Sequence, residues 1–103
     1  MEDSPVGAPQ IVKIDAEGFD LQVIEGAKST ISTAEVVLVE AAVCNPQYDN
    51  TVLKVIEAMD QLGMKLWNIT DLNRTPNRRV LWLIEAVFIP KDGFLDRLSQ
   101  NYD

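Results

Sequence analysis

The sequence predicts an α/β fold built on one mixed sheet, and three observations indicate it. A short apolar run at Gln10–Ile14 is followed by an acidic turn and then by helical periodicity, which is the first half of a βαβ unit. The run Glu35–Ala42 is apolar without alternation, which is typical of a strand buried on both faces. No helical pattern separates the last two apolar runs, so we expect their strands to pair antiparallel.

The first unit comprises a strand at Gln10–Ile14 and a helix at Phe19–Ser32. Apolar residues recur at Val23, Ala27 and Ile31, so one face of this helix is expected to pack on the sheet. The residues before this unit, 1–9, show no periodicity, and we expect them to form a flexible lead-in to the domain.

The second unit comprises the strand at Glu35–Ala42 and a helix at Asp49–Leu62. Asp49 or Asn50 is expected to cap the start of the helix, because short polar side chains accept hydrogen bonds from the first free N–H groups. Gly63 stands where a glycine commonly ends a helix.

The last part of the chain is expected to hold a strand at Met64–Ile69, a polar loop at Thr70–Arg79 and a strand at Val80–Ile89. One short turn of helix is expected at Phe94–Leu98. The order is therefore β-α-β-α-β-β, and residues 10–103 are expected to form a single α/β domain.

Composition restricts the classes of function. The net charge of −7 argues against nucleic acid or an anionic membrane as a main partner, since both require clustered Lys and Arg. Histidine is absent and Cys44 is the single cysteine, so Cys–His catalysis and an intrachain disulfide are excluded. The N-terminus lacks the pattern of a signal peptide, and we expect a cytoplasmic protein.

In this arrangement three carboxylates lie at the carboxyl ends of neighbouring parallel strands. They belong to Asp15, Glu17 and Glu40. Adjacent strands lie ~4.8 Å apart, so the three side chains can converge. Converging carboxylates can supply a general base or hold a divalent cation. The structural alternatives are that Asp15 and Glu17 stabilise the start of the helix, and that Glu40 pairs with Lys13 or with an arginine of the 74–79 loop.

The turn after the first strand carries a specific signal. Residues Val12–Asp20 read VKIDAEGFD and Val23–Ala27 read VIEGA, and together they resemble the FkbM-type S-adenosylmethionine-dependent methyltransferases. The segments Val37–Glu40 and Glu85–Ile89 resemble two further strands of that family. The resemblance extends from about residue 10 to residue 89.

This resemblance implies a three-layer, partial Rossmann-like sheet, the C-terminal half of a methyltransferase, with helices on the sheet faces. The implied strand order is 1-2-4-3 in this chain's own numbering, with the strand from Val80 antiparallel. It further implies S-adenosylmethionine as the cofactor. Asp15, Glu17 and Glu40 would then be the catalytic residues on the substrate side.

The chain also departs from the family's pattern. The glycine-rich loop that cradles the cofactor has no counterpart, and neither has the acidic residue that holds the ribose. We therefore expect the substrate-side half of a methyltransferase that is incomplete or inactive alone. Two other hypotheses are a non-catalytic interaction module built from a half-sheet and a small metal-binding domain that uses the acids.

The strand at Gln10–Ile14 is interior in the parent architecture, so one of its edges is expected to be open here. Open edges normally carry protective residues, and only Lys13 and Pro9 serve here. We therefore expect a homodimer, or pairing with a complementing chain, through this edge. The alternative is that residues 1–9 fold back over it.

Overall fold

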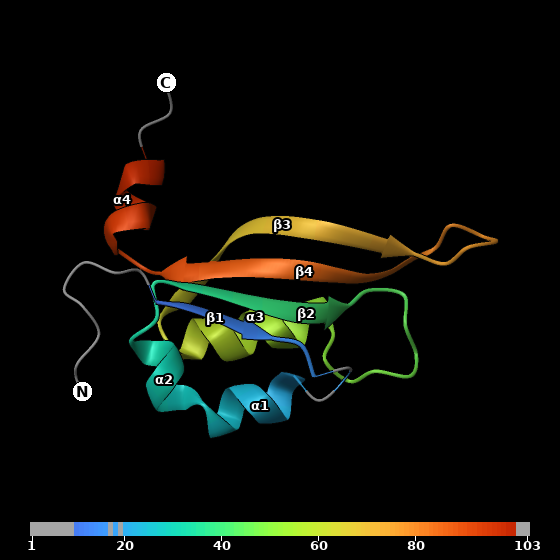
Figure 1. Cartoon of the computed structure of the whole chain (residues 1–103), viewed down its shortest axis with the longest axis horizontal. Coiled ribbons are helices and arrows are strands. Elements are labelled where there is room, and N and C mark those ends of the chain that lie inside the picture. The colour runs from blue at the N-terminus through green and yellow to red at the C-terminus, as the bar shows by residue number, and fades with distance from the viewer. Residues whose placement is uncertain (1–9, 17, 19, 101–103) are drawn as a thin grey trace.

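The structure is a computed structural model that describes residues 10–16, 18 and 20–100 (Figure 1). The lead-in expected for residues 1–9 lies outside this described part. The elements in chain order are β1 (Ile11–Ile14), α1 (Asp20–Gly26), α2 (Lys28–Ser32), β2 (Val36–Ala42), α3 (Val52–Gln61), β3 (Met64–Arg74), β4 (Leu81–Pro90) and α4 (Phe94–Ser99).

The four strands form one sheet in the order β1-β2-β4-β3. Strand β1 pairs parallel with β2, whereas β4 lies antiparallel to both β2 and β3. The predicted α/β class, the order 1-2-4-3 and the antiparallel last strand are therefore confirmed. Because β4 reverses direction between them, β3 runs in the same direction as β1 and β2.

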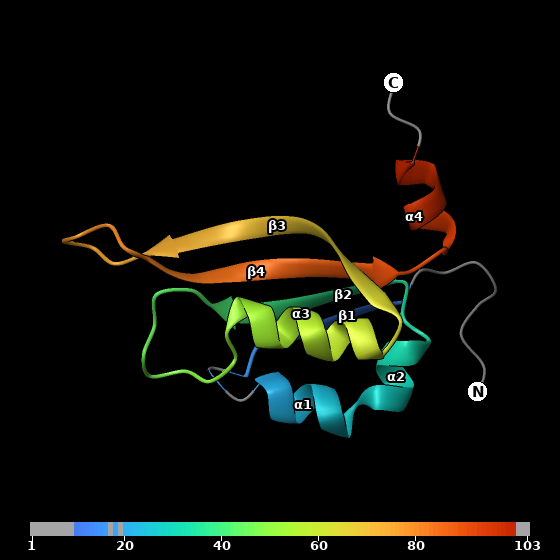
Figure 2. The ribbon, with the colours of Figure 1, turned by 180° about the vertical axis from the view of Figure 1, so that it is seen from behind.

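Helices α1, α2 and α3 share one face of the sheet. Their buried residues include Ile24, Ile31 and Met59, and these join one core cluster with Val37 and Phe88 of the strands. Figure 2 shows α3 in front of β1 and β2 in the rear view. Both helical connections advance in the same direction along the sheet, so the right-handed crossover rule places their helices on the same side.

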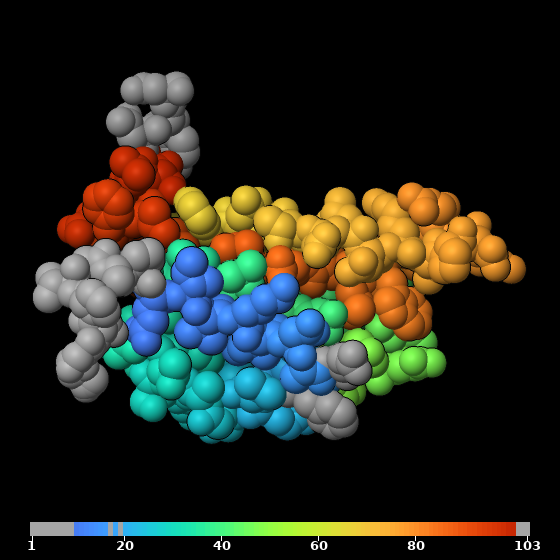
Figure 3. Space-filling model, in the orientation of Figure 1, coloured from blue at the N-terminus to red at the C-terminus, as the bar shows by residue number. Residues whose placement is uncertain are grey.

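The opposite face is covered far less by the described residues. Figure 3 shows β1, β2 and β4 reaching the surface between β3 and α1. Of the three layers expected, the second helical layer is represented in the described part only by α4, beside the end of β4. Strand β2, whose sequence is apolar without alternation, therefore has one face in the core and one half-buried face.

The helix expected at Phe19–Ser32 is interrupted. Within its described residues it divides at Ala27, whose backbone (φ −113°, ψ 22°) departs from helical geometry between α1 and α2. Gly26 stands at the break, and a Cβ added there would meet nothing within 4 Å. The backbone freedom of glycine therefore weakens the helix without any packing contact to compensate.

Helix α3 begins later than predicted, with Thr51 as its N-cap. The Thr51 hydroxyl accepts a hydrogen bond from the Lys54 N–H at 3.3 Å. The predicted caps were therefore wrong, and Asn50 is instead fully buried. Gly63 ends the helix as predicted, with a positive φ of 80°.

Strand β3 extends to Arg74, so the loop expected at Thr70–Arg79 is wrong over its first half. Residues 70–74 pair with β4, and the turn is closed where the Thr75 N–H donates to the Val80 carbonyl at 2.8 Å. The polar residues are compatible with a strand because β3 forms an edge of the described sheet, where one side is solvated.

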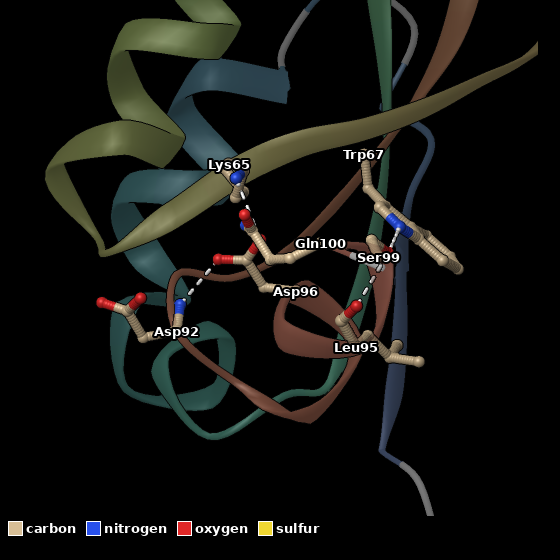
Figure 4. Close-up of polar contacts among 7 residues, drawn as sticks. All are labelled: Lys65, Trp67, Asp92, Leu95, Asp96, Ser99 and Gln100. Carbon is tan, nitrogen blue, oxygen red and sulfur yellow. Dashed lines mark hydrogen bonds and ion pairs between the residues drawn. The ribbon is translucent and has the colours of Figure 1, made fainter. Parts of the chain in front are cut away.

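Helix α4, predicted at Phe94–Leu98, is held by Asp96 (Figure 4). The carboxylate accepts hydrogen bonds from the Asp92 N–H at 2.8 Å, from Lys65 Nζ at 2.9 Å and from Gln100 Nε2 at 3.1 Å. The Asp92 N–H and then Lys65 hold the pKa of Asp96 below its ordinary value. Met64 is in the core, so by alternation Lys65 joins α4 to the other face of the sheet.

Candidate functional site

Three carboxylates form a row across the less covered face of the sheet. Glu40 of β2 and Glu85 of β4 are direct partners in the antiparallel register. Asp15 follows Ile14, whose register partner is Val39, so Asp15 stands next to Glu40 at the end of β1. We call Asp15, Glu40 and Glu85 the acid row.

Glu85 is held by two neighbouring side chains on the sheet. Its Oε1 accepts a hydrogen bond from Thr70 Oγ1 at 2.8 Å, and its Oε2 lies 3.4 Å from Lys13 Nζ. The Lys13 side chain is 61% exposed, so this ion pair contributes at most about 1 kcal/mol. Its main effect is to offset the repulsion between the two glutamates, which face each other across the strands.

The acid row lines a shallow pocket of about 180 Å³. Its lining residues are Lys13, Ile14, Asp15, Glu40, Asp71, Asn73, Ile84 and Glu85. Asp71 reaches the pocket from a register shift in β3 and has a positive φ of 48°, a conformation that Asp tolerates better than most residues. Bulges of this kind commonly redirect a side chain beside a functional site.

The structure brings two of the three predicted site residues together. Asp15 and Glu40 line the same pocket, whereas Glu17 lies outside the described residues. Sequence reasoning missed Glu85, although a lone charge in the most apolar strand was the same signal that had pointed to Glu40. It also missed Asp71, because that residue was assigned to a loop and not to β3.

The arginines of the 74–79 segment and Cys44 lie away from the acid row. Arg74 donates from Nη1 to the Arg79 carbonyl at 3.2 Å within the β3–β4 hairpin. Cys44 is exposed and lines a separate hollow with Trp82 and Arg78. Neither the arginines nor the cysteine line the acid-row pocket.

The acid row can perform proton chemistry. Carboxylates are among the side chains that proteins use as general bases and acids. Among the residues that the structure describes, no group of three or more acids or cysteines has the arrangement of a metal site. Proton acceptance from a bound substrate is one reaction step that such carboxylates can perform.

A comparison with protein-family models assigns the chain. The model of the methyltransferase FkbM domain matches residues 2–66 of the 103. The chain belongs to this family. In the FkbM domain described here, the match extends over β1, the acidic turn, β2 and α3 to the start of β3. Comparisons with curated proteins and with solved structures gave no match.

The family implies dependence on S-adenosylmethionine. The acid-row pocket, at about 180 Å³, is smaller than the ~300 Å³ at which pockets for ligands of drug size begin. Gly18 in the β1–α1 turn faces the Tyr48 ring, which an added Cβ would approach to 3.0 Å. At Gly18 this turn is thus packed closely against the Tyr48 side chain.

Proposed function

We propose that this FkbM domain is the acceptor side of an S-adenosylmethionine-dependent methyltransferase. The observation that carries the proposal is the convergence of Asp15 and Glu40 in one pocket at the carboxyl ends of two parallel strands. In open α/β sheets, ligands bind in this position. Membership of the FkbM family supplies the reaction class.

In this proposal the acceptor presents a hydroxyl or amine to the acid row. Asp15 is exposed and follows the end of β1, so it is the residue best placed to accept the proton that the acceptor releases. Glu85, held by Thr70 and Lys13, positions the acceptor. Glu40 lies between the two acids and is the second candidate base; Glu17 is proposed as a further site residue because it lies in the same turn.

We also propose that the 103-residue chain is only part of a complete enzyme. In this view another polypeptide segment supplies the cofactor site, whether it precedes these residues in a longer chain or belongs to a separate one. We expect the 103-residue chain to transfer no methyl group from radiolabelled S-adenosylmethionine. When fused to the cofactor-binding half of an FkbM methyltransferase of known acceptor, it is expected to transfer the label to that acceptor. A fusion that folds and binds the cofactor but transfers nothing would contradict the proposal.

The outer edge of β1 is proposed as the surface that receives a second strand. The Gln10 carbonyl accepts hydrogen bonds from Glu35 and Val36 on the β2 side. By alternation, Ile11 and Lys13 direct their backbone groups toward the outer edge. Ile11 is also 62% exposed. The other edge of the described sheet, β3, is interrupted by register shifts, which protect a strand against pairing.

In the isolated chain, we propose that this edge pairs with the same edge of a second copy. Sedimentation equilibrium at micromolar concentration is expected to show a dimer. Ile11→Pro removes an outward N–H and is expected to give a monomer that keeps its circular dichroism spectrum, whereas Ile11→Thr, which keeps the N–H, is expected to remain dimeric. A wild-type monomer, or equal dimerisation of both variants, would refute the contact.

The same edge supports a second candidate function, a non-catalytic interaction module, which would retain dimerisation and gain no transferase activity in the fusion.

None of the helices in the described part of the chain is long and apolar enough to cross a membrane. We also propose a cytoplasmic location, which agrees with the single cysteine.

A further inference from the structure

A buried polar pair lies behind the acid row. Asp20, at the start of α1, and Asn50, just before α3, are both 0% exposed. Asn50 Nδ2 donates to Asp20 Oδ1 at 3.2 Å and to the Glu40 carbonyl at 2.9 Å. The main-chain carbonyl of Asn50 in turn accepts a hydrogen bond from the Ala42 N–H at 2.8 Å. Asn50 therefore links the start of α1 to the end of β2.

Two buried oxygens of this pair remain unsatisfied by the described residues. They are Asp20 Oδ2 and Asn50 Oδ1, and neither has a hydrogen-bond partner there. An amide oxygen and an ionised carboxylate are both acceptors, so they cannot satisfy each other. Leaving two buried acceptors without donors is costly, and more so when one carries charge.

A single proton removes this conflict. We infer that Asp20 is held as a neutral carboxylic acid that forms a reciprocal pair with Asn50. The Oδ2–H of Asp20 donates to Asn50 Oδ1, while one N–H of Asn50 Nδ2 donates to Asp20 Oδ1. The second N–H of Nδ2 remains on the Glu40 carbonyl. Every side-chain oxygen and nitrogen of the pair is then used.

The surroundings favour the neutral form. Burial raises the pKa of Asp20, and nearby backbone groups, first those of Gly18 and Glu40, oppose this only in part. No Lys or Arg occurs in residues 14–26 or 36–53, which carry the pair and the segments around it. Besides Asp20, the titratable residues of these two segments are Asp15, Glu17, Glu25, Glu40, Cys44, Tyr48 and Asp49.

Basic residues nearby are directed elsewhere. Lys13 of β1 pairs with Glu85 on the other face, Lys28 of α2 pairs with Glu25 at 2.8 Å, and Lys54 of α3 is exposed. Among the described residues of these elements, no Lys or Arg is thus seen to pair with the Asp20 carboxylate. The neutral pair acts as a positioning device, because it fixes the β1–α1 turn that bears Asp15 against the end of β2 that bears Glu40. This inference does not depend on methyl transfer.

The proton on Asp20 sets the direction in which folding stability changes with pH. The folded chain binds a proton at Asp20 that the unfolded chain has released, so stability falls as pH rises from the ordinary pKa of Asp toward the raised one. Asp20→Asn replaces the neutral acid by an amide of the same shape, which can form the same reciprocal pair without a proton. The variant should therefore lack this loss.

The experiment compares urea unfolding of the full chain and its variants at about pH 5 and about pH 8. We expect the wild-type midpoint to fall between the two values by more than that of Asp20→Asn. At the higher pH the variant should equal or exceed the wild type. Asp49→Asn, an exposed acid in the same loop, should keep the wild-type dependence.

Carbon-13 NMR of the Asp20 carboxyl group gives a second readout that a merely structural role would not produce. Its signal is expected to remain that of a protonated acid through the pH range in which aspartates in model peptides titrate. An Asp20 that titrates within that range would overturn the inference. So would an Asp20→Asn chain that fails to fold or loses more stability at the higher pH, since either result means that the charge itself is required.

Discussion

Replacement of Asp15 by Asn in the fused, cofactor-supplied enzyme is expected to lower the rate of methyl transfer by about 10²–10⁴-fold, the usual contribution of a general base. Asparagine keeps the shape of the side chain but cannot accept the acceptor's proton. Since Asp15 is exposed at the end of β1, the substitution should leave the fold intact. Initial rates with radiolabelled S-adenosylmethionine measure the loss.

Two further variants sharpen this prediction. Glu40→Gln tests the neighbouring acid of the same pocket and should also lower the rate. Glu57→Gln removes a carboxylate from an exposed position on α3, outside the pocket, and should leave the rate unchanged. Equal rates for all three variants would mean that the acid row takes no part in the reaction.

The second large effect concerns stability. Phe88→Ala is expected to reduce the free energy of unfolding by about 3–5 kcal/mol, as removal of a buried aromatic ring usually does. Phe88 is 0% exposed in the C-terminal half of β4, where it is the register partner of both Val37 and Leu66. The cavity would lie within the core cluster that joins the sheet to α1–α3. A loss of this size is a large part of the ~5–15 kcal/mol typical of a domain.

Phe94→Ala is the matched control for this stability prediction. Phe94 is the same residue type but is 73% exposed at the start of α4, so its loss should change the free energy of unfolding by less than about 0.5 kcal/mol. Urea denaturation followed by circular dichroism measures both variants. Similar losses for the two would show that Phe88 does not stabilise the core more than an exposed phenylalanine does.

The sheet could be predicted from the sequence because its signals are long and local. The apolar runs that became β2 and β4 have few polar residues, and the absence of a helical pattern before β4 identified it as antiparallel. The end of β3 could not be found in this way. Residues 70–74 are polar and exposed, and only their pairing with β4 makes them a strand.

The candidate site was predicted in part for a related reason. Asp15 and Glu40 lie near the carboxyl ends of two strands that were predicted to be neighbours, so their proximity could be predicted. Glu85 joins them through the β2–β4 register, which no local pattern specifies. Asn50 shows the limit most clearly, because its sequence position suggests a helix cap, whereas tertiary packing buries it against Asp20.

The central claim is that this FkbM domain provides the acceptor side of a methyltransferase and does not hold the cofactor by itself. Calorimetric titration with S-adenosylmethionine tests it directly, using the 103-residue chain and the same chain fused to a cofactor-binding half. We expect no binding heat from the chain alone and micromolar binding from the fusion. Micromolar binding by the chain alone, or none by a folded fusion, would contradict the claim.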